Sequence, residues 1–197
     1  MVEKYNKKLK QYFKKRFIRE ISADEGYTKA SVAVVLDTAS KKPNVLFIKR
    51  TENPGDSYSG HVAFPGGKMC DSDSNPLDTA VRETNEEVGI NLNDVSTFIG
   101  RLDDLKPLNP SGPRFIVSPF LFILNKEITV KINKDEVQQY MWISLDHLSD
   151  INNMRIRYKE REGRIIEDYV YSYENFIIWG MTGRIINSLI KEVSVII

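Results

Sequence analysis

The most constraining feature of this chain is a pair of adjacent glycines that is soon followed by a segment crowded with carboxylates. The glycines end the stretch GHVAFPGGK (residues 60–68), and RETNEEVG occupies residues 82–89. Glycine lets another group approach the main chain closely. Glu83, Glu86 and Glu87 are spaced i, i+3 and i+4, so they would share one face of a helix. Three carboxylates on one patch repel each other unless a cation lies among them.

The carboxylates fall within a segment that has clear helix boundaries. Asn75 is a good N-cap residue, and Pro76 suits the first helical position. Gly89 is a natural terminator. A stripe that recurs every four residues could pack on a sheet: Ala80, Thr84 and Val88. We therefore predict a helix between the proline and the glycine.

The chemistry of this helix allows two interpretations. No His or Cys accompanies the glutamates, and all-oxygen ligands favour Mg²⁺ or Mn²⁺ over zinc. The alternative is a solvated helix face with ion pairs, for which Arg82 stands one turn before Glu86. The residues upstream of the helix, which include the glycine pair, favour the metal-binding interpretation.

Elsewhere, hydrophobic periodicity predicts a single mixed α/β domain. Apolar residues at helical spacing indicate an amphipathic helix over residues 3–19, and a closing helix follows residue 177. β-rich segments predict two hairpins and three further strands, over residues 30–37 with 44–50, 153–159 with 164–173, 95–105, 114–124 and 138–145. Interspersed strands and helices indicate one domain, with residues 1–25 as an N-terminal extension of a domain spanning residues 26–197.

Composition excludes several classes of function. The chain has 197 residues and a formal net charge of +1, which gives no indication of a nucleic-acid partner. The lone Cys70 cannot form an internal disulfide, and no apolar run is long enough for a signal peptide or a membrane span. We therefore expect a cytoplasmic protein with no nucleic-acid or membrane partner. The lysines of residues 3–19 form either a solvated face or an electrostatic aid for a polyphosphate substrate or an acidic partner.

The carboxylate segment and the glycine pair together resemble the Nudix hydrolase family. RETNEEVGI, residues 82–90, matches the second half of the Nudix box, Arg-Glu-U-X-Glu-Glu-X-Gly-U, with Thr84 in place of an apolar residue U. Gly67 matches the box glycine. The family has a glutamate where this chain has Asp73, and eight residues rather than seven separate that position from Arg82. The resemblance covers about residues 30–190.

The longer box is similar to the branch of this family that hydrolyses coenzyme A. That branch carries an upstream motif, Leu-Leu-Thr-X-Arg-Ser, then Arg, then Gly-X-X-X-Phe-Pro-Gly-Gly. LFIKRT (residues 46–51) and GHVAFPGG (residues 60–67) fit its ends, but the middle Arg is absent and Gly55 and Asp56 stand near its place. Downstream, IIWGMTGRII (residues 177–186) looks like the branch's Trp-Gly-X-Thr helix.

The resemblance implies a fold and a set of site residues. The fold would be an α/β/α sandwich with a mixed β-sheet, in which the Nudix box forms a loop–helix–loop. Mg²⁺ (or Mn²⁺) would be held by carboxylates and one main-chain carbonyl, from Glu83, Glu86, Glu87 and Gly67. Arg82 would orient the helix carboxylates. The general base that activates water is either Glu83 or Glu136, and a surface loop carboxylate is the alternative interpretation of Glu136.

The resemblance also points to candidate substrate-binding residues. They are Arg50, Gly60, Phe64, Gly66 and Lys68. Lys68 would meet a phosphate or remain an ordinary surface lysine, and the Phe64 ring is expected to pack in the core. Trp142 and Trp179 are expected in the core, and His61 in a loop rather than as a catalyst.

These observations predict a metal-dependent pyrophosphohydrolase of a small nucleotide. The preferred substrate is coenzyme A or a derivative, cleaved to adenosine bisphosphate and (acyl-)phosphopantetheine. The missing motif Arg keeps open another nucleoside diphosphate derivative, such as ADP-ribose or a dinucleotide. A non-catalytic nucleotide-binding module is a further alternative, although all three box glutamates are present. Residues 3–19 and 154–172 are candidate homodimer contacts.

Overall fold

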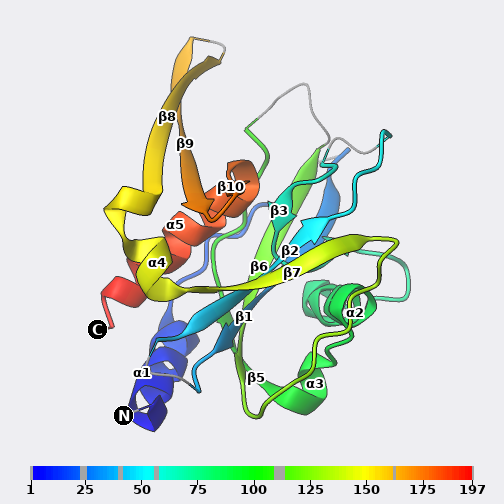
Figure 1. The fold of residues 1–197 in the computed structure, drawn as a ribbon, viewed down its shortest axis with the longest axis vertical. Helices are drawn as coiled ribbons and strands as arrows, with labels where there is room; N and C mark the ends of the chain where they lie inside the picture. Colours follow the sequence, from blue (N-terminus) through cyan, green and yellow to red (C-terminus); the bar gives the residue numbers. More distant parts are fainter. Residues whose placement is uncertain are drawn as a thin grey trace.

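A computed structural model describes residues 2–22, 26–39, 42–55, 58–108, 114–161 and 163–196. Within these residues a mixed β-sheet forms the centre of the molecule (Figure 1). Its strands run in the order β3-β2-β1-β6-β5, and β4 and β7 pair with β1 and β2. The strands are β1 (Thr28–Asp37), β2 (Asn44–Arg50), β3 (Val62–Ala63), β4 (Gly66–Lys68), β5 (Ser96–Arg101), β6 (Phe115–Leu124) and β7 (Val137–Ser144).

The central pair of strands is parallel, while its neighbours are antiparallel. β1 runs parallel to β6, from Thr28 opposite Phe115 to Leu36 opposite Ile123. β1 and β2 form the predicted hairpin, with Leu36 opposite Val45. A parallel pair needs a crossover connection. Here the chain between β1 and β6 supplies the glycine pair and the box helix.

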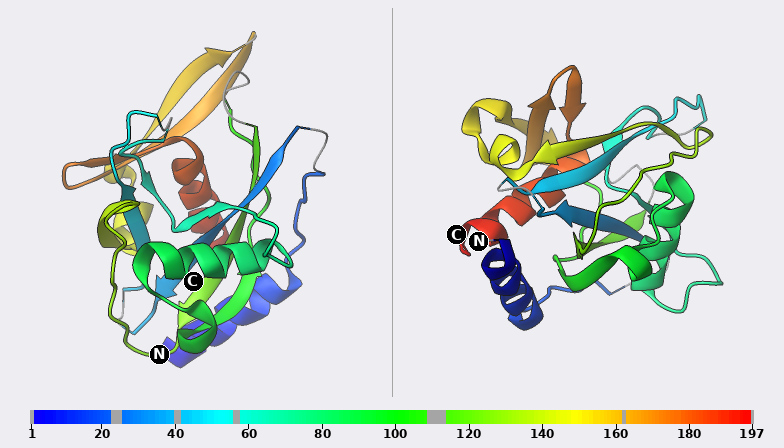
Figure 2. Two further views of the ribbon diagram at one scale, coloured as in Figure 1. Left: turned by 90° about the vertical axis from the view of Figure 1, so that its right-hand side faces the viewer. Right: turned by 60° about the horizontal axis from the view of Figure 1, so that its bottom comes forward.

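The alternation of side chains along β1 produces a core on each face of the sheet. Ala33 and Val35 pack in the cluster that contains Ala80 and Val88 of α2 (Pro76–Val88). The intervening Val34 and Leu36 pack in the other cluster, with α1 (Val2–Lys15) and α5 (Gly180–Ser194). Because successive side chains of a strand point to opposite faces, one strand serves both layers. The result is the predicted α/β/α arrangement, which Figure 2 shows from two further directions.

Helix α2 begins and ends as its sequence predicts. The Asn75 side chain accepts hydrogen bonds from the main-chain N–H groups of Leu77 and Asp78, and Pro76 is the first helical residue. Gly89 adopts φ 68° and donates to the Asn85 carbonyl. Ala80, Thr84 and Val88 are fully buried, so the predicted stripe is the face that packs on the sheet. A short helix, α3 (Leu92–Val95), follows.

Helix α1 ends at Lys15, four residues earlier than the sequence pattern predicts. The chain beyond it binds the loop after β5 instead of continuing the helix. Arg16 forms an ion pair with Asp103 at 2.7 Å, and the main chain of Arg19 exchanges hydrogen bonds with Asp103 and Asp104. Tertiary contacts therefore replace the last turn, and Phe17 is left exposed.

The C-terminal part adds a second, three-stranded sheet that extends away from the first (Figure 1). α4 (Leu145–Ser149) and a 3₁₀ turn, η1 (Ile151–Asn153), lead into it. The predicted hairpin forms from β8 (Met154–Arg161) and β9 (Arg164–Tyr173), and β10 (Phe176–Ile178) pairs with β9. α5 then packs against both the hairpin and the main core. Across the described residues, every helix is too short or too polar to cross a bilayer.

The contact between α5 and β9 depends on a glycine, which gives a test of the fold. A Cβ at Gly183 would collide with the main-chain carbonyl oxygen of Tyr169. Alanine normally favours a helix over glycine by about 1 kcal/mol, but overpacking against backbone costs about 1–3 kcal/mol. We expect Gly183→Ala to lower the free energy of unfolding in denaturant titrations, whereas Ser188→Ala on the same helix leaves it within about 0.5 kcal/mol. A more stable Gly183→Ala variant would contradict this packing.

Candidate functional site

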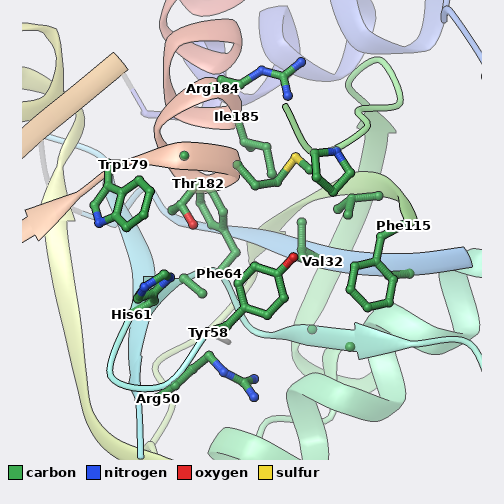
Figure 3. Close-up of a pocket in the computed structure, with 18 of the residues that line it drawn as sticks. Val32, Arg50, Tyr58, His61, Phe64, Phe115, Trp179, Thr182, Arg184 and Ile185 are labelled. Atoms are coloured by element: carbon green, nitrogen blue, oxygen red, sulfur yellow. The ribbon is translucent and has the colours of Figure 1, made fainter. Parts of the chain in front are cut away.

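A cavity of about 1040 Å³ lies where the glycine pair, α2 and the start of α5 meet. Figure 3 shows Arg50 and Tyr58 on one side of this space and Arg184 and Ile185 of α5 on the other. Glu83, Glu87 and Glu136 line one end. Lys159, Trp179 and Arg184 line the wall formed by the β8–β9 hairpin and α5. The cavity therefore spans both the predicted site and a part of the chain that no sequence prediction assigned to it.

The two glycines permit close contact between β4, β1 and the carboxylates of α2. Gly66 has φ 152°, and a Cβ there would collide with the main chain of Ser31 and Val32. A Cβ at Gly67 would collide with the carboxylate of Glu83. A carboxylate of α2 therefore lies against the bare main chain of the glycine pair.

Glu87 is the most deeply buried of the three box glutamates. It is 1% exposed, and its Oε2 accepts a hydrogen bond of 2.9 Å from the Gly66 main-chain N–H. Arg50 Nη1 lies 3.9 Å from its Oε1. Burial raises the pKa of Glu87 to about 8, and the neighbouring Glu83 and Glu136 charges add to the rise, although the Gly66 N–H and Arg50 oppose it. Burial also raises the pKa of Glu83, with Glu86 and Glu136 contributing.

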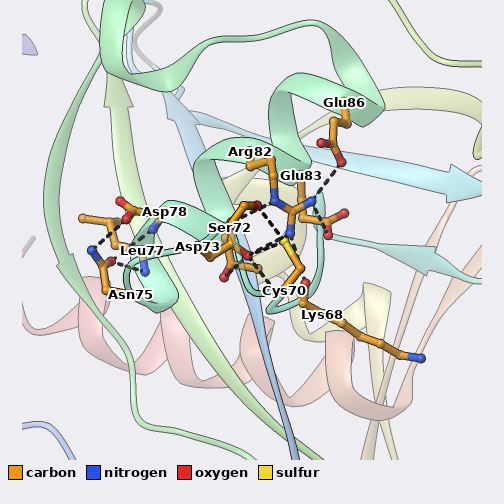
Figure 4. A network of polar contacts seen from close by, with 11 residues as sticks. Lys68, Cys70, Ser72, Asp73, Asn75, Leu77, Asp78, Arg82, Glu83 and Glu86 are labelled. Carbon is orange, nitrogen blue, oxygen red and sulfur yellow. Dashed lines mark hydrogen bonds and ion pairs between the residues drawn. The ribbon is translucent and has the colours of Figure 1, made fainter.

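Arg82 connects the helix to the loop before it (Figure 4). Its guanidinium makes two hydrogen bonds to Asp73, of 2.8 and 3.0 Å, and donates to the Lys68 carbonyl at 3.0 Å. It also pairs with Glu83 and Glu86, each at 2.9 Å, so the predicted Arg82–Glu86 pair forms. The bidentate bond to Arg82 holds the pKa of Asp73 well below its ordinary value. The aspartate thus holds the arginine even though the box is one residue longer.

The three box glutamates do not occupy one patch. Glu83 and Glu87 lie at the glycine pair, whereas the Glu86 side chain is 50% exposed and pairs with Arg82. Among the described residues, no three His, Cys, Asp or Glu side chains are gathered as a metal site. The donor set nevertheless fits a hard cation, because two carboxylates with raised pKa values and no soft ligand adjoin the main chain of the glycine pair.

The remaining predicted residues fall into different places. Arg50, Phe64, Gly66 and Lys68 line the cavity. Phe64 is also core, at 2% exposure and with its ring centroid 4.7 Å from that of Phe47. The Lys68 ammonium lies 5.5 Å from the Phe115 ring centroid. Gly60 has φ 68° and forms the turn before the cavity-lining His61.

Sequence reasoning missed several cavity residues, among them Ser31, Tyr58, Lys159, Asp168 and Arg184. The expectation that Trp179 is a core residue is wrong, since the side chain is 39% exposed and lines the cavity. Its similarity to the Trp-Gly-X-Thr segment was the one signal available. Ser31 is fully buried, and within the part of the chain that the structure describes its hydroxyl has no hydrogen-bond partner.

Comparison with known proteins identifies the family. A model of the NUDIX domain matches residues 27–169. A Nudix hydrolase named NudL from Photorhabdus laumondii, described as uncharacterized, is 32% identical over 163 residues, which cover 83% of this chain and 84% of that protein. The NudL protein of Yersinia pestis is also 32% identical, over 85% of this chain and 82% of its own. The chain therefore belongs to the Nudix hydrolase family and acts on diphosphate bonds of nucleoside diphosphate substrates.

Solved structures agree with this fold. A MutT/nudix family protein from Enterococcus faecalis aligns with a TM-score of 0.52 at 18% identity, over 93% of this chain and 71% of that one. A binary complex of a C. elegans Ap4A hydrolase aligns with a TM-score of 0.51 at 23% identity, over 60% of this chain and 81% of that one. Nudix hydrolases generally need divalent metal ions.

The burial of Glu87 makes a prediction for the metal-free protein. Its ordinary pKa is 4.5 and its folded pKa is about 8, so between these values the folded state holds a proton that the unfolded state releases. The free energy of unfolding therefore falls as pH rises through this window. Glu87→Gln removes the titration. We expect this variant to be more stable than wild type by about 1–3 kcal/mol near pH 8.5 in EDTA, measured by denaturant titration.

The half-exposed Glu86 supplies a matched control for this experiment. Glu86→Gln removes an equal charge one residue away, on a side chain that solvent already screens. Its stability should follow the wild-type dependence on pH. If Glu87→Gln instead kept the wild-type slope between about pH 6 and 8.5, the carboxylate would not be buried as described.

Proposed function

We propose that this chain is a divalent-metal-dependent pyrophosphohydrolase that cleaves the diphosphate bond of coenzyme A or its derivatives. The products are adenosine bisphosphate and (acyl-)phosphopantetheine. The observation that carries the chemistry is the contact of the partly buried Glu83 and the buried Glu87 with the glycine pair at one end of a large cavity. Buried carboxylates that touch a bare main chain are unfavourable alone and become a binding site with a hard cation.

The proposed metal ligands are Glu83, Glu86, Glu87 and the Gly67 carbonyl, with Mg²⁺ or Mn²⁺ as the ion. When bound, the ion supplies charge neutralisation for the diphosphate and lowers the pKa of water. To bind the ion, the Glu86 carboxylate would leave its ion pair with Arg82. Arg82 keeps its two bonds to Asp73 and its bond to the Lys68 carbonyl, so it still fixes the loop against α2.

The chain's other residues position the substrate and water. Arg50 and Lys68 line the cavity near the glutamates and can neutralise phosphate oxygens. The proposed base is Glu83 or Glu136, both of which line the cavity. The Glu136 charge raises the pKa of Glu83 and of Glu87, which supports its place beside them. The main chain of Glu136 is fixed by a hydrogen bond from the Thr51 N–H to its carbonyl, at 2.9 Å.

Two features support coenzyme A as the substrate. The upstream motif places Arg50, Phe64 and the glycine pair around the cavity. The cavity of about 1040 Å³ lies at the upper end of small-molecule sites, which are about 300–1,000 Å³, so it has room for a long arm beyond the nucleotide. The apolar side chains of Val32, Met181 and Ile185 line part of it and suit such an arm.

The absence of the motif's middle arginine favours a second candidate. Gly55, near that position, lines the cavity and carries no charge, and Asp56 lies outside the described residues. A nucleoside diphosphate derivative such as ADP-ribose or a dinucleotide would then be the substrate. The non-catalytic alternative is weaker because the three box glutamates are retained.

The cellular setting also belongs to the proposal. We place the enzyme in the cytoplasm, in keeping with its single, exposed Cys70. A homodimer contact through the β8–β9 hairpin is supported by the exposed Tyr158 and Ile165. Neither feature is needed for the chemistry.

A nucleotide panel with and without metal tests the substrate. Coenzyme A, ADP-ribose and diadenosine polyphosphates would be incubated with Mg²⁺, Mn²⁺ or EDTA, and products separated by chromatography. We expect metal-dependent release of adenosine bisphosphate from coenzyme A, with the highest kcat/KM. Brisk turnover of ADP-ribose without turnover of coenzyme A would establish the second candidate instead.

Removing one carboxylate tests whether the site is catalytic. We expect Glu87→Gln to lower kcat by about 10²-fold or more, the scale of losing one electrostatic or acid-base group. Glu127→Gln, on an exposed residue outside the cavity, is the control and should retain wild-type rates. Equal rates in wild type and Glu87→Gln, or no activity in either across the panel, would favour a nucleotide-binding module.

A further inference from the structure

The wall of the cavity formed by the β8–β9 hairpin and α5 is rich in basic side chains. Two cations of this wall, Lys159 and Arg184, line the cavity, and a third, Arg157, contacts the Trp179 ring as Lys159 does. The single carboxylate among them is Asp168, which is 2% exposed. We refer to these five residues as the basic wall. Three basic side chains and one carboxylate leave the wall with a net positive charge.

Asp168 holds two of the cations in place. Its Oδ2 accepts hydrogen bonds from Arg157 at 2.5 Å and from Lys159 at 2.7 Å, and its Oδ1 accepts from the Gly180 main-chain N–H at 3.1 Å. Burial alone would raise the pKa of Asp168, but these partners outweigh it and lower the pKa. The carboxylate is therefore ionised and joins the hairpin to the first residue of α5.

Trp179 gives the same two cations an aromatic support. Its ring centroid lies 5.3 Å from the Arg157 guanidinium carbon and 5.2 Å from the Lys159 ammonium. The His61 ring lies 4.9 Å away, centroid to centroid. Since the indole already contacts two cations and a histidine, the wall offers positive charge rather than a surface for base stacking. The Lys159 side chain is 36% exposed and lines the cavity, so its ammonium can contact a ligand there.

The basic wall is fixed relative to the catalytic end. The Thr182 hydroxyl donates to the Val62 carbonyl at 3.1 Å, which ties α5 to the strand just before the glycine pair. Gly183 allows α5 to touch the main chain of β9 at Tyr169. Arg184 donates to the Lys106 carbonyl at 2.7 Å. These contacts of the Trp-Gly-X-Thr segment thus fix the distance between the basic wall and the proposed diphosphate site.

We propose that the basic wall is a binding subsite for a phosphate monoester of the substrate that is separate from the scissile diphosphate, with Lys159 as its principal contact. This inference rests on the proposed function and deepens it, because coenzyme A carries such a group on its ribose and ADP-ribose does not. Lysine has three N–H donors, so a phosphate can bind while Asp168 retains one of them. Charge-assisted bonds of this kind are the strong ones.

The test compares two substrates that differ only in that phosphate. Coenzyme A and 3′-dephospho-coenzyme A share the diphosphate and the pantetheine arm. We expect wild type to prefer coenzyme A in kcat/KM by about tenfold or more, and Lys159→Gln to lose most of this preference while hydrolysing the dephospho substrate at close to the wild-type rate. Asp168 keeps Arg157 and Gly180 as partners in this variant, so the fold is retained.

Lys191→Gln is the matched control. Lys191 lies on α5 with its ammonium 5.7 Å from the Tyr169 ring centroid, and it does not line the cavity. This variant should keep the wild-type preference. The subsite would be refuted if wild type hydrolysed both substrates equally well, or if Lys159→Gln slowed both by the same factor or left the preference unchanged.

A binding measurement separates this inference from the proposed activity. If wild type hydrolysed neither substrate, the proposed function would fail. Calorimetric titration with adenosine 3′,5′-bisphosphate and with AMP would then decide the subsite. Tighter binding of the bisphosphate by wild type, lost in Lys159→Gln and kept in Lys191→Gln, supports it. Equal affinities of wild type for the two nucleotides overturn it.

Discussion

The burial of Glu87 beneath the glycine pair is the interaction on which the site depends. A carboxylate at 1% exposure, with one main-chain N–H as its short hydrogen bond, is held in an unfavourable environment by the packing around it. The α2 stripe on the sheet provides that packing, since Ala80, Thr84 and Val88 fix which way the helix faces. The stability of the core thus compensates for a strained electrostatic arrangement that a cation can relieve.

On both sides of the cavity, buried carboxylates bind arginine and lysine side chains and so hold neighbouring segments together. Arg82 and Asp73 form a bidentate pair that holds the loop before α2 against the helix. Glu83 and Glu87 lie at the glycine pair, on the same helix. Across the cavity, Asp168 gathers Arg157 and Lys159 in the same manner. Among the described residues, the buried Asp73 and Asp168 each bind arginine or lysine at 2.8 Å or less, whereas the buried Glu87 has Arg50 at 3.9 Å. That imbalance is where a metal ion has a physical reason to bind.

Much of the fold could be predicted from the sequence, because helix ends and hairpins depend on residues that are close together in the chain. Asn75, Pro76 and Gly89 mark the ends of α2 through backbone hydrogen bonding that neighbouring residues satisfy. Both hairpins form as predicted, since alternation and turn residues act over short distances. The end of α1 was not predicted, because the contacts that stop it at Lys15 come from Asp103 and Asp104, far along the chain.

By itself, the sequence determined the family, the box helix with its caps, and the identity of the carboxylates. Only the tertiary structure decided which carboxylates meet the glycines. Successive helical residues are about 100° apart, so packing that turns Glu87 inward sends Glu86 outward to Arg82. It also decided that Trp179 lines the cavity with Lys159, because a second sheet and α5 carry them there from a distant part of the chain. Local spacing fixes angles on one element, whereas the juxtaposition of elements arises only when their apolar faces pack together.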